Sequence, residues 1–206
     1  GGKFARSFNY TANRSLAYSS SDSIVIQDNS AGRPYPSKIQ VKGVNGLVSK
    51  AYVTIRGFSH SFPDDVHILL VKGDKKVVLM GNAGGPAPLN GVSNLILGFD
   101  DGAANALPDE TKLTSGAFKP ANYGTPNLPS PAPGGPYTST LASFNLIDPN
   151  GDWDLYVFDD TFSDEGSISG GWTLVFETAP QIVAINNQVG IEDVTLPVTV
   201  QILDAD

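Results

Sequence analysis

Two segments near the carboxyl end of the sequence, Asp152–Phe158 and Ile168–Glu177, constrain the fold more than any other part of the chain. Apolar and polar residues alternate along both segments, with Trp153 near the start of one and Trp172 within the other. A period of two is typical of β-strands with one buried face. Two tryptophans at matching positions can bury a large apolar area in a sandwich core. An acidic, glycine-containing turn at 159–166 separates the segments, so the sequence predicts two strands joined as a hairpin.

Seven further short strands are expected, because each is bounded by Gly, Pro, Asn or Asp. They are Asp22–Asp28, Ser37–Val44, Lys50–Phe58, Asp65–Lys72, Lys75–Met80, Asn94–Phe99 and Leu141–Leu146. The fourth and fifth are separated by a glycine-containing turn at 72–74, which indicates a hairpin. No long run has the apolar spacing of a helix. The pattern therefore predicts an all-β fold, either a sandwich or a barrel.

The length and the changes in composition along the chain divide it into three parts. A chain of 206 residues is long enough for one sizeable domain. Residues 1–21 are interpreted as a linker or a strand entering from a preceding domain, and residues 22–178 as the β-sandwich. Residues 179–206 begin with Ala179-Pro180 and are interpreted as a linker followed by the truncated start of another β module.

Charge and cysteine content exclude several classes of protein. The chain carries 21 acidic and 13 basic residues, for a formal net charge of −8, which disfavours nucleic acid and anionic membranes as partners. It has no cysteine, so neither disulfides nor a thiol nucleophile are possible. No stretch approaches the roughly 18 apolar residues of a membrane helix, so no membrane insertion is expected.

Acidic residues follow two of the predicted strands and are the first candidates for a metal site. These candidates are Asp100, Asp101, Asp159, Asp160 and Asp164. If their loops meet at one end of the sandwich, the carboxylates supply the oxygen ligands that Ca²⁺ requires. Aspartates in turns also accept hydrogen bonds from nearby backbone amides. The sequence therefore indicates structural calcium at these loops and leaves turn capping open as the alternative.

The sequence contains little that suggests catalysis. His60 and His67 are its only histidines, and without cysteine they make a poor zinc site. There is no Gly-x-Ser-x-Gly motif of the kind that positions a serine nucleophile. A pair of carboxylates for glycoside hydrolysis is formally possible, but the acidic residues lie in Gly/Asp turns. We therefore expect a protein that is not an enzyme, with His60 bracing a loop through hydrogen bonds.

Three motifs occur in the order in which one known family has them. They are Ser59–His60 with Asp65–Val66 and the Gly73–Asp74 turn, then Phe99–Asp101, then Gly151–Leu155 with the acidic turn and Trp172–Leu174. Together they cover residues 22 to 178 and resemble the P domain (Homo B domain) that follows the catalytic domain of subtilisin-like proprotein convertases. The resemblance implies an eight-stranded jelly-roll β-sandwich, similar to galactose-binding-like domains.

The same resemblance implies a function. In convertases the P domain supports the folding and activity of the adjoining protease, but the sequence has no subtilisin-type catalytic motifs. Residues 180–206 are similar to the first strands of cadherin-like or bacterial immunoglobulin-like repeats. We therefore expect a non-catalytic accessory module of a secreted or cell-surface bacterial protein, which stabilises or spaces neighbouring domains of the same polypeptide.

The segment 100–140 supports an alternative function, a module that binds carbohydrate or protein. It is rich in Gly, Pro, Ala and Asn, and a loop of this length is unusual within a domain. Tyr123 and Tyr137 lie in this loop, where aromatic rings can stack on a ligand. The competing interpretation is that Phe118 and Tyr123 tether the loop to the sandwich.

Overall fold

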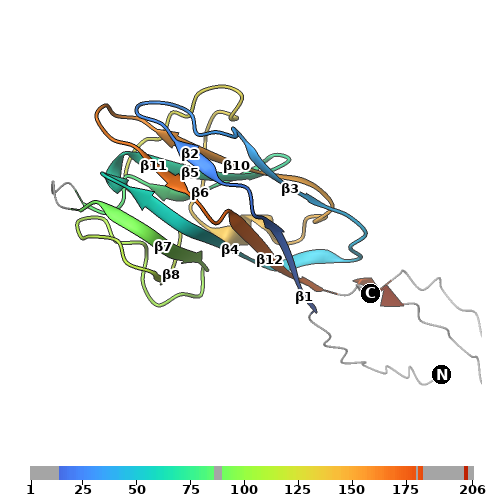
Figure 1. Ribbon diagram of the computed structural model, residues 1–206. Coiled ribbons are helices and arrows are strands. Elements are labelled where there is room, and N and C mark those ends of the chain that lie inside the picture. The colour runs from blue at the N-terminus through green and yellow to red at the C-terminus, as the bar shows by residue number, and fades with distance from the viewer. Residues whose placement is uncertain (1–13, 86–89, 180, 183–201, 204–206) are drawn as a thin grey trace, which may run out of the picture.

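Two β-sheets pack face to face around one apolar core in the computed structural model, which describes residues 14–85, 90–179, 181–182 and 202–203 (Figure 1). The first sheet has the order β1-β12-β4-β11-β2, and β7 pairs with both β4 and β8. Its strands are β1 Arg14–Ser20, β2 Ile24–Ile26, β4 Leu47–His60, β7 Val92–Phe99, β8 Gly116–Phe118, β11 Gly166–Ile168 and β12 Trp172–Ala179. The all-β sandwich expected from the sequence is confirmed, whereas the jelly-roll type stays a prediction.

The second sheet has the order β3-β10-β5-β6-β9. Its strands are β3 Ser37–Val41, β5 Val66–Lys72, β6 Lys75–Gly81, β9 Ala121–Asn122 and β10 Gly151–Asp159. Strands β5 and β6 form the predicted hairpin, with Lys72 opposite Lys75. A short 3₁₀ helix, η1 Pro63–Asp65, leads from β4 in the first sheet to β5 in the second.

The longest strand, β4, spans 14 residues and organises the first sheet. Its first half pairs with β12 and its last residues pair with β11, while β7 lies along the opposite edge. Apolar side chains alternate along β4 and point into the core, as the period of two predicts. The two ends of β4 therefore mark the two ends of the sandwich.

Both tryptophans are fully buried in the core, as the sequence predicts. The Trp153 ring lies parallel to that of Phe176, with 6.3 Å between the centroids. Each indole N–H has an acceptor, because Trp153 Nε1 donates to Pro149 O at 2.8 Å and Trp172 Nε1 donates to Ser37 Oγ at 3.0 Å. The aromatic bodies therefore contribute apolar burial without leaving a buried donor unpaired.

The predicted hairpin between the two tryptophan strands is wrong. Strand β10 belongs to the second sheet and pairs with β3 and β5, whereas β12 belongs to the first sheet and pairs with β1 and β4. The predicted single strand Ile168–Glu177 is also divided into β11 and β12 by a turn at Ser169–Gly170. The chain thus crosses from one sheet to the other, and the two tryptophans enter the core from different sheets instead of along a shared ladder.

The predicted strand Leu141–Leu146 is wrong as well, because residues Leu141–Phe144 form a 3₁₀ helix, η2. The Asp101 carboxylate accepts hydrogen bonds from the backbone N–H groups of Leu141 and Ala142 at 2.9 and 2.8 Å. These contacts cap the first turn and hold the chain in a helical conformation. Leu141 and Phe144 still point into the core, which explains the apolar pattern.

The segment Thr125–Pro136 covers the outer face of the second sheet. Its Leu128 packs against Leu69, Val71, Val78 and Tyr156 in a second apolar cluster. As a result, β5 is buried on both of its faces. The sequence correctly predicts that this proline-rich run is not a strand, and the run instead shields side chains that alternation alone assigns to the outer face of the sandwich.

Residues at both ends of the sandwich sequence also form strands. Within the predicted leading segment 1–21, Arg14–Ser20 is β1, which pairs antiparallel with β12. After the sandwich, β13 Gln181–Ile182 pairs antiparallel with β14 Ile202–Leu203. The rest of the predicted segments 1–21 and 179–206 lies largely outside the described part of the chain. The residues outside it are 1–13, 180, 183–201 and 204–206.

Candidate functional site

The five predicted metal ligands divide between opposite ends of the sandwich. Asp100 Oδ1 lies 3.3 Å from Lys50 Nζ, near the start of β4, whereas Asp159 Oδ2 lies 3.0 Å from His60 Nε2 at the end of β4. Ten residues of extended strand between Lys50 and His60 span roughly 33 Å. The expected convergence of these loops at one end is therefore wrong.

At the end near the start of β4, Asp100 and Asp101 both accept hydrogen bonds from backbone N–H groups of turns. Asp100 Oδ1 accepts a hydrogen bond from Gly102 N–H at 2.8 Å. Asp101 caps η2 and also accepts the hydroxyl hydrogen of Thr140 at 2.6 Å. Turn capping, the alternative that the sequence leaves open, describes both side chains.

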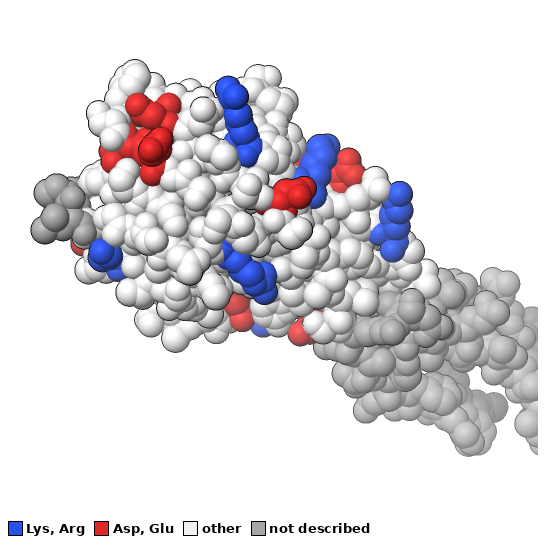
Figure 2. All heavy atoms as spheres, in the orientation of Figure 1, with Lys and Arg blue, Asp and Glu red and all other residues white. Residues whose placement is uncertain are grey.

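At the second end, Asp159 is the buried last residue of β10, and Asp160 and Asp164 lie in the loop between β10 and β11. Acidic side chains gather on the surface at this end in Figure 2. Asp159 Oδ1 accepts from Thr161 N–H at 3.0 Å, and Asp164 Oδ1 accepts from Ser61 Oγ at 2.7 Å. Across residues 14–85, 90–179 and the strands β13 and β14, no three His, Asp or Glu side chains form a group that could hold a metal ion. The donors of the expected calcium site therefore do not fit together here, and calcium binding stays a prediction.

His60 is fully buried between the two sheets and contacts Asp159. Its Nδ1 accepts a hydrogen bond from Phe62 N–H at 3.2 Å, so the ring hydrogen of the neutral imidazole lies on Nε2, facing the carboxylate. His60 Nε2 and Asp159 Oδ2 are 3.0 Å apart, but the angles at these atoms do not meet those of a hydrogen bond. Burial raises the pKa of Asp159, and the Thr161 N–H and His60 partly oppose this rise. His60 thus braces the loop after β4 through the hydrogen bond from Phe62 N–H, as expected, and contacts β10 at Asp159.

His67 forms a second buried contact with an aspartate. It lies on the face of β5 opposite Val66 and Ile68, and its Nε2 is 2.7 Å from Asp160 Oδ2. Its side chain is buried, and its ring stacks on that of Phe158 with 6.3 Å between the centroids. Both histidines therefore join the acidic β10–β11 loop to the body of the sandwich.

Asp65, which sequence reasoning did not select as a site residue, has a strongly perturbed carboxylate. Its side chain is 6% exposed at the end of η1. Burial raises its pKa to about 7, and the neighbouring carboxylates add to the rise; these are Asp159, Asp160, Asp164 and Asp64. The adjacent pair Asp64-Asp65 directly before an apolar strand is the one signal of this in the sequence.

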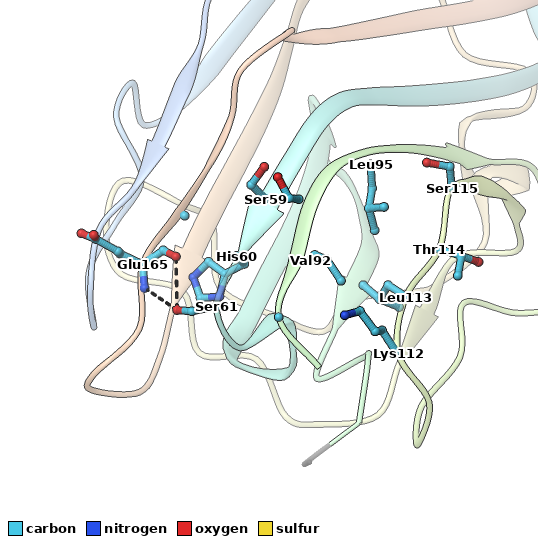
Figure 3. A pocket seen from close by; sticks show the side chains of 13 residues that line it. Ser59, His60, Ser61, Val92, Leu95, Lys112, Leu113, Thr114, Ser115 and Glu165 are labelled. Atoms are coloured by element: carbon cyan, nitrogen blue, oxygen red, sulfur yellow. Dashed lines mark hydrogen bonds between the residues drawn. The ribbon is translucent and has the colours of Figure 1, made fainter. Parts of the chain in front are cut away.

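A groove of about 740 Å³ lies beside this acidic end (Figure 3). Ser59, His60 and Ser61 from the end of β4 line one side, and Lys112–Ser115 line the other. The lining also includes Gly91–Ser93, Leu95 and Glu165–Gly166. The groove therefore offers several hydroxyl groups and an ammonium to a ligand, over an apolar floor, whereas the Glu165 carboxylate points away from it in Figure 3.

One glycine lets the strands at the groove approach each other closely. A Cβ atom at Gly166 would collide with the Ser59 carbonyl oxygen and with the His60 ring. Glycine at this position of β11 therefore allows the ladder with β4 to form at the groove. From the sequence alone, Gly166 is expected in a tight turn instead.

The two loop tyrosines tether the segment 100–140 to itself. Tyr123 Oη donates to Leu107 O at 2.7 Å, and Tyr137 Oη donates to Pro133 O at 2.8 Å. Tyr137 also packs against the second apolar cluster, while Tyr123 remains 44% exposed. Neither ring lines the groove, and the part of this segment that lines it is Lys112–Ser115.

Comparison with known proteins gives no relative. No protein-family model matches the chain, and no curated protein and no solved structure matches it. In the described residues, no helix has the length and apolar character needed to cross a membrane. The P-domain resemblance therefore rests on the motifs in the sequence.

Proposed function

We propose that this chain contains a non-catalytic accessory module of the P-domain type, which packs against neighbouring domains of a secreted or cell-surface bacterial protein. The observation that carries the proposal is the pairing of the first and last strands. Arg14 of β1 lies opposite Thr178 of β12, so the chain enters and leaves the sandwich side by side (Figure 1). A spacer between domains would keep its two ends apart. This geometry favours packing against a neighbour over spacing.

The positions of the histidines support a structural role. Both ring nitrogens of His60 face protein groups, Phe62 N–H and the Asp159 carboxylate. Of the two hydroxyls next to His60 in sequence, Ser61 Oγ donates to Asp164 and Ser59 Oγ accepts from Asn94 N–H. A serine nucleophile needs a base within hydrogen-bond reach. These side chains hold the sheets together, and this arrangement supports an accessory module better than a hydrolase.

Truncation tests the proposal. The 206-residue chain is compared with a chain that ends at Ala179 and so keeps every strand of the sandwich. If the sandwich packs against the segment 180–206, removal of that segment lowers its stability by at least about 1 kcal/mol, or roughly 2–4 °C in midpoint. The measurement is thermal unfolding followed by tryptophan fluorescence, since both tryptophans lie in the core. Equal midpoints would reject packing against this segment.

The groove supports a second candidate function, a module that binds carbohydrate or protein. It lies at the end of β4, whereas the terminal segments leave from the start of β4, so the groove faces away from the attachment to neighbouring domains. Glycan arrays and pull-downs on insoluble polymers test this function. Loss of binding in Lys112→Ala, with binding retained in the distant Lys75→Ala, would support it. Absence of any bound glycan or protein would leave the accessory role as the better account.

A further inference from the structure

Strand β1 has one unpaired edge at the border of the first sheet. It runs from Arg14 to Ser20 and pairs antiparallel with β12 along all seven residues, without a bulge. Among the residues that the structure describes, none forms a ladder or a backbone hydrogen bond with the other edge of β1. The N–H and C=O groups along such an edge are a template for pairing with a further strand.

The other edge strands of the two sheets carry features that oppose such pairing. Strands β2 and β8 have three residues each and β9 has two, while β3 directly follows Pro36 and carries the exposed Lys38. Short strands, prolines and lysines are the usual means by which natural sheets keep their edges from associating. Strand β1 has none of them, because it contains no proline and its only charged residue is Arg14, at its first position. Its edge is therefore open to another strand.

The side chains of β1 alternate between the core and the outer face of the sheet. Leu16 and Tyr18 pack against the main core but stay partly exposed, and the Tyr18 ring stacks on that of Phe176 with 5.5 Å between the centroids. The exposed side chains on the outer face are all small; they are Ser15, Ala17 and Ser19. A strand added at this edge would cover the two apolar side chains and meet no bulky group on the other face.

The sequence of β1 is complementary to itself when two copies run antiparallel. The register that pairs all seven residues places Ala17 opposite Ala17 of the second copy. Residues opposite each other in an antiparallel pair share a face, so Leu16 then meets Tyr18 on the core face, and aromatic–aliphatic pairs of this kind stabilise sheets. No like charges meet, because Arg14 lies opposite Ser20. A shift by one residue would instead place core-facing side chains opposite outward-facing ones.

From this edge we propose that two copies of the chain associate through β1, so that their first sheets join into one continuous antiparallel sheet. The second copy supplies the missing backbone partners and covers Leu16 and Tyr18. Seven residues on each side are fewer than the roughly 20–30 of a standard interface, so the dimer is weak and reversible. The proposal goes beyond the accessory role and does not depend on it.

Sedimentation velocity of the 206-residue chain tests the association. Between about 1 µM and 1 mM, the range of dissociation constants of weak complexes, the mean mass is expected to rise from monomer towards dimer. Ala17→Lys places two ammonium groups opposite each other at the centre of the ladder, and we expect it to weaken the dimer at least about tenfold. Val25→Lys is the matched control, because it adds the same charge at a 48% exposed residue of β2, at another edge of the same sheet. This control should leave the dimer unchanged.

Cysteine cross-linking tests the register. The chain has no cysteine, so a single introduced thiol forms a disulfide only with a second copy. In Ala17→Cys the two thiols lie opposite each other, within the reach of a disulfide. In Ser20→Cys they lie six residues apart along the ladder, or about 20 Å. Mild oxidation should therefore cross-link the first variant and leave the second unlinked.

Two results would overturn the proposal. One is a monomer over the whole concentration range. The other is a dimer that Ala17→Lys leaves intact, because its contact would then lie elsewhere on the molecule. Thermal unfolding of Ala17→Lys with the midpoint of the wild type confirms that the sandwich itself is folded, as expected for an exposed position. Truncation at Ala179 bears on the accessory function alone, so the two proposals succeed or fail separately.

Discussion

The Asp65 carboxylate makes a quantitative prediction about stability and pH. Its pKa rises from 3.8 to about 7 in the folded protein, chiefly through burial. At 1.36 kcal/mol for each pKa unit, this rise corresponds to at most about 4 kcal/mol. Because the folded pKa lies above the unfolded one, the folded state binds the proton more tightly. The contribution is therefore fully present below pH 4 and is lost as the pH rises through 7.

Asp65→Asn isolates this contribution. The neutral amide resembles the protonated acid, so the variant is expected to lose the part of the pH dependence that Asp65 causes. Above pH 7 it should be more stable than the wild type by up to about 4 kcal/mol, and near pH 4 the two should differ little. Asp64 and Asp159 also have raised pKa values, and their repulsion with Asp65 is part of the contribution that Asp65→Asn removes.

The assay is urea unfolding between pH 4 and pH 8, with a chelator present so that no divalent cation neutralises the carboxylates. Asp74→Asn is the control, because its side chain is 85% exposed in the β5–β6 turn. This control should follow the wild type at every pH. Parallel pH profiles for the wild type and Asp65→Asn would refute the assignment of Asp65 as a buried acid with a raised pKa.

Two further predictions concern the core and calcium. Trp153→Ala and Trp172→Ala should each lower the free energy of unfolding by roughly 3–5 kcal/mol, measured by urea unfolding. The control Phe162→Ala removes an exposed ring and should change it by less than about 0.5 kcal/mol. A loss below about 1 kcal/mol at either tryptophan would contradict the core assignment. If calcium binds the β10–β11 loop, free calcium at about 100 times its Kd should add roughly 2.7 kcal/mol, or about 5–10 °C in midpoint. Asp160→Ala should reduce that shift and Asp101→Ala, at the opposite end, should not; equal midpoints in calcium and in chelator would rule out such a site.

Local spacing along the chain was enough to establish the all-β class, most of the strands and the burial of both tryptophans. Those properties can be read from the sequence because a period of two requires a strand with one face in an apolar core. The expected bracing role of His60 is also confirmed, because its position at the end of an apolar strand already places it between the sheets. Patterns of this kind can be recognised without knowing which strands are neighbours.

Strand pairing and the grouping of loops at each end of the sandwich became visible only in the folded chain. Strands β10 and β12 have the alternation of a hairpin, yet they lie in different sheets, because alternation specifies a buried face and not a partner. The same limit affected the aspartates, since their turns look alike in sequence but lie at opposite ends of β4. The raised pKa of Asp65 arises from contacts between distant segments, and such contacts exist only once the chain has folded.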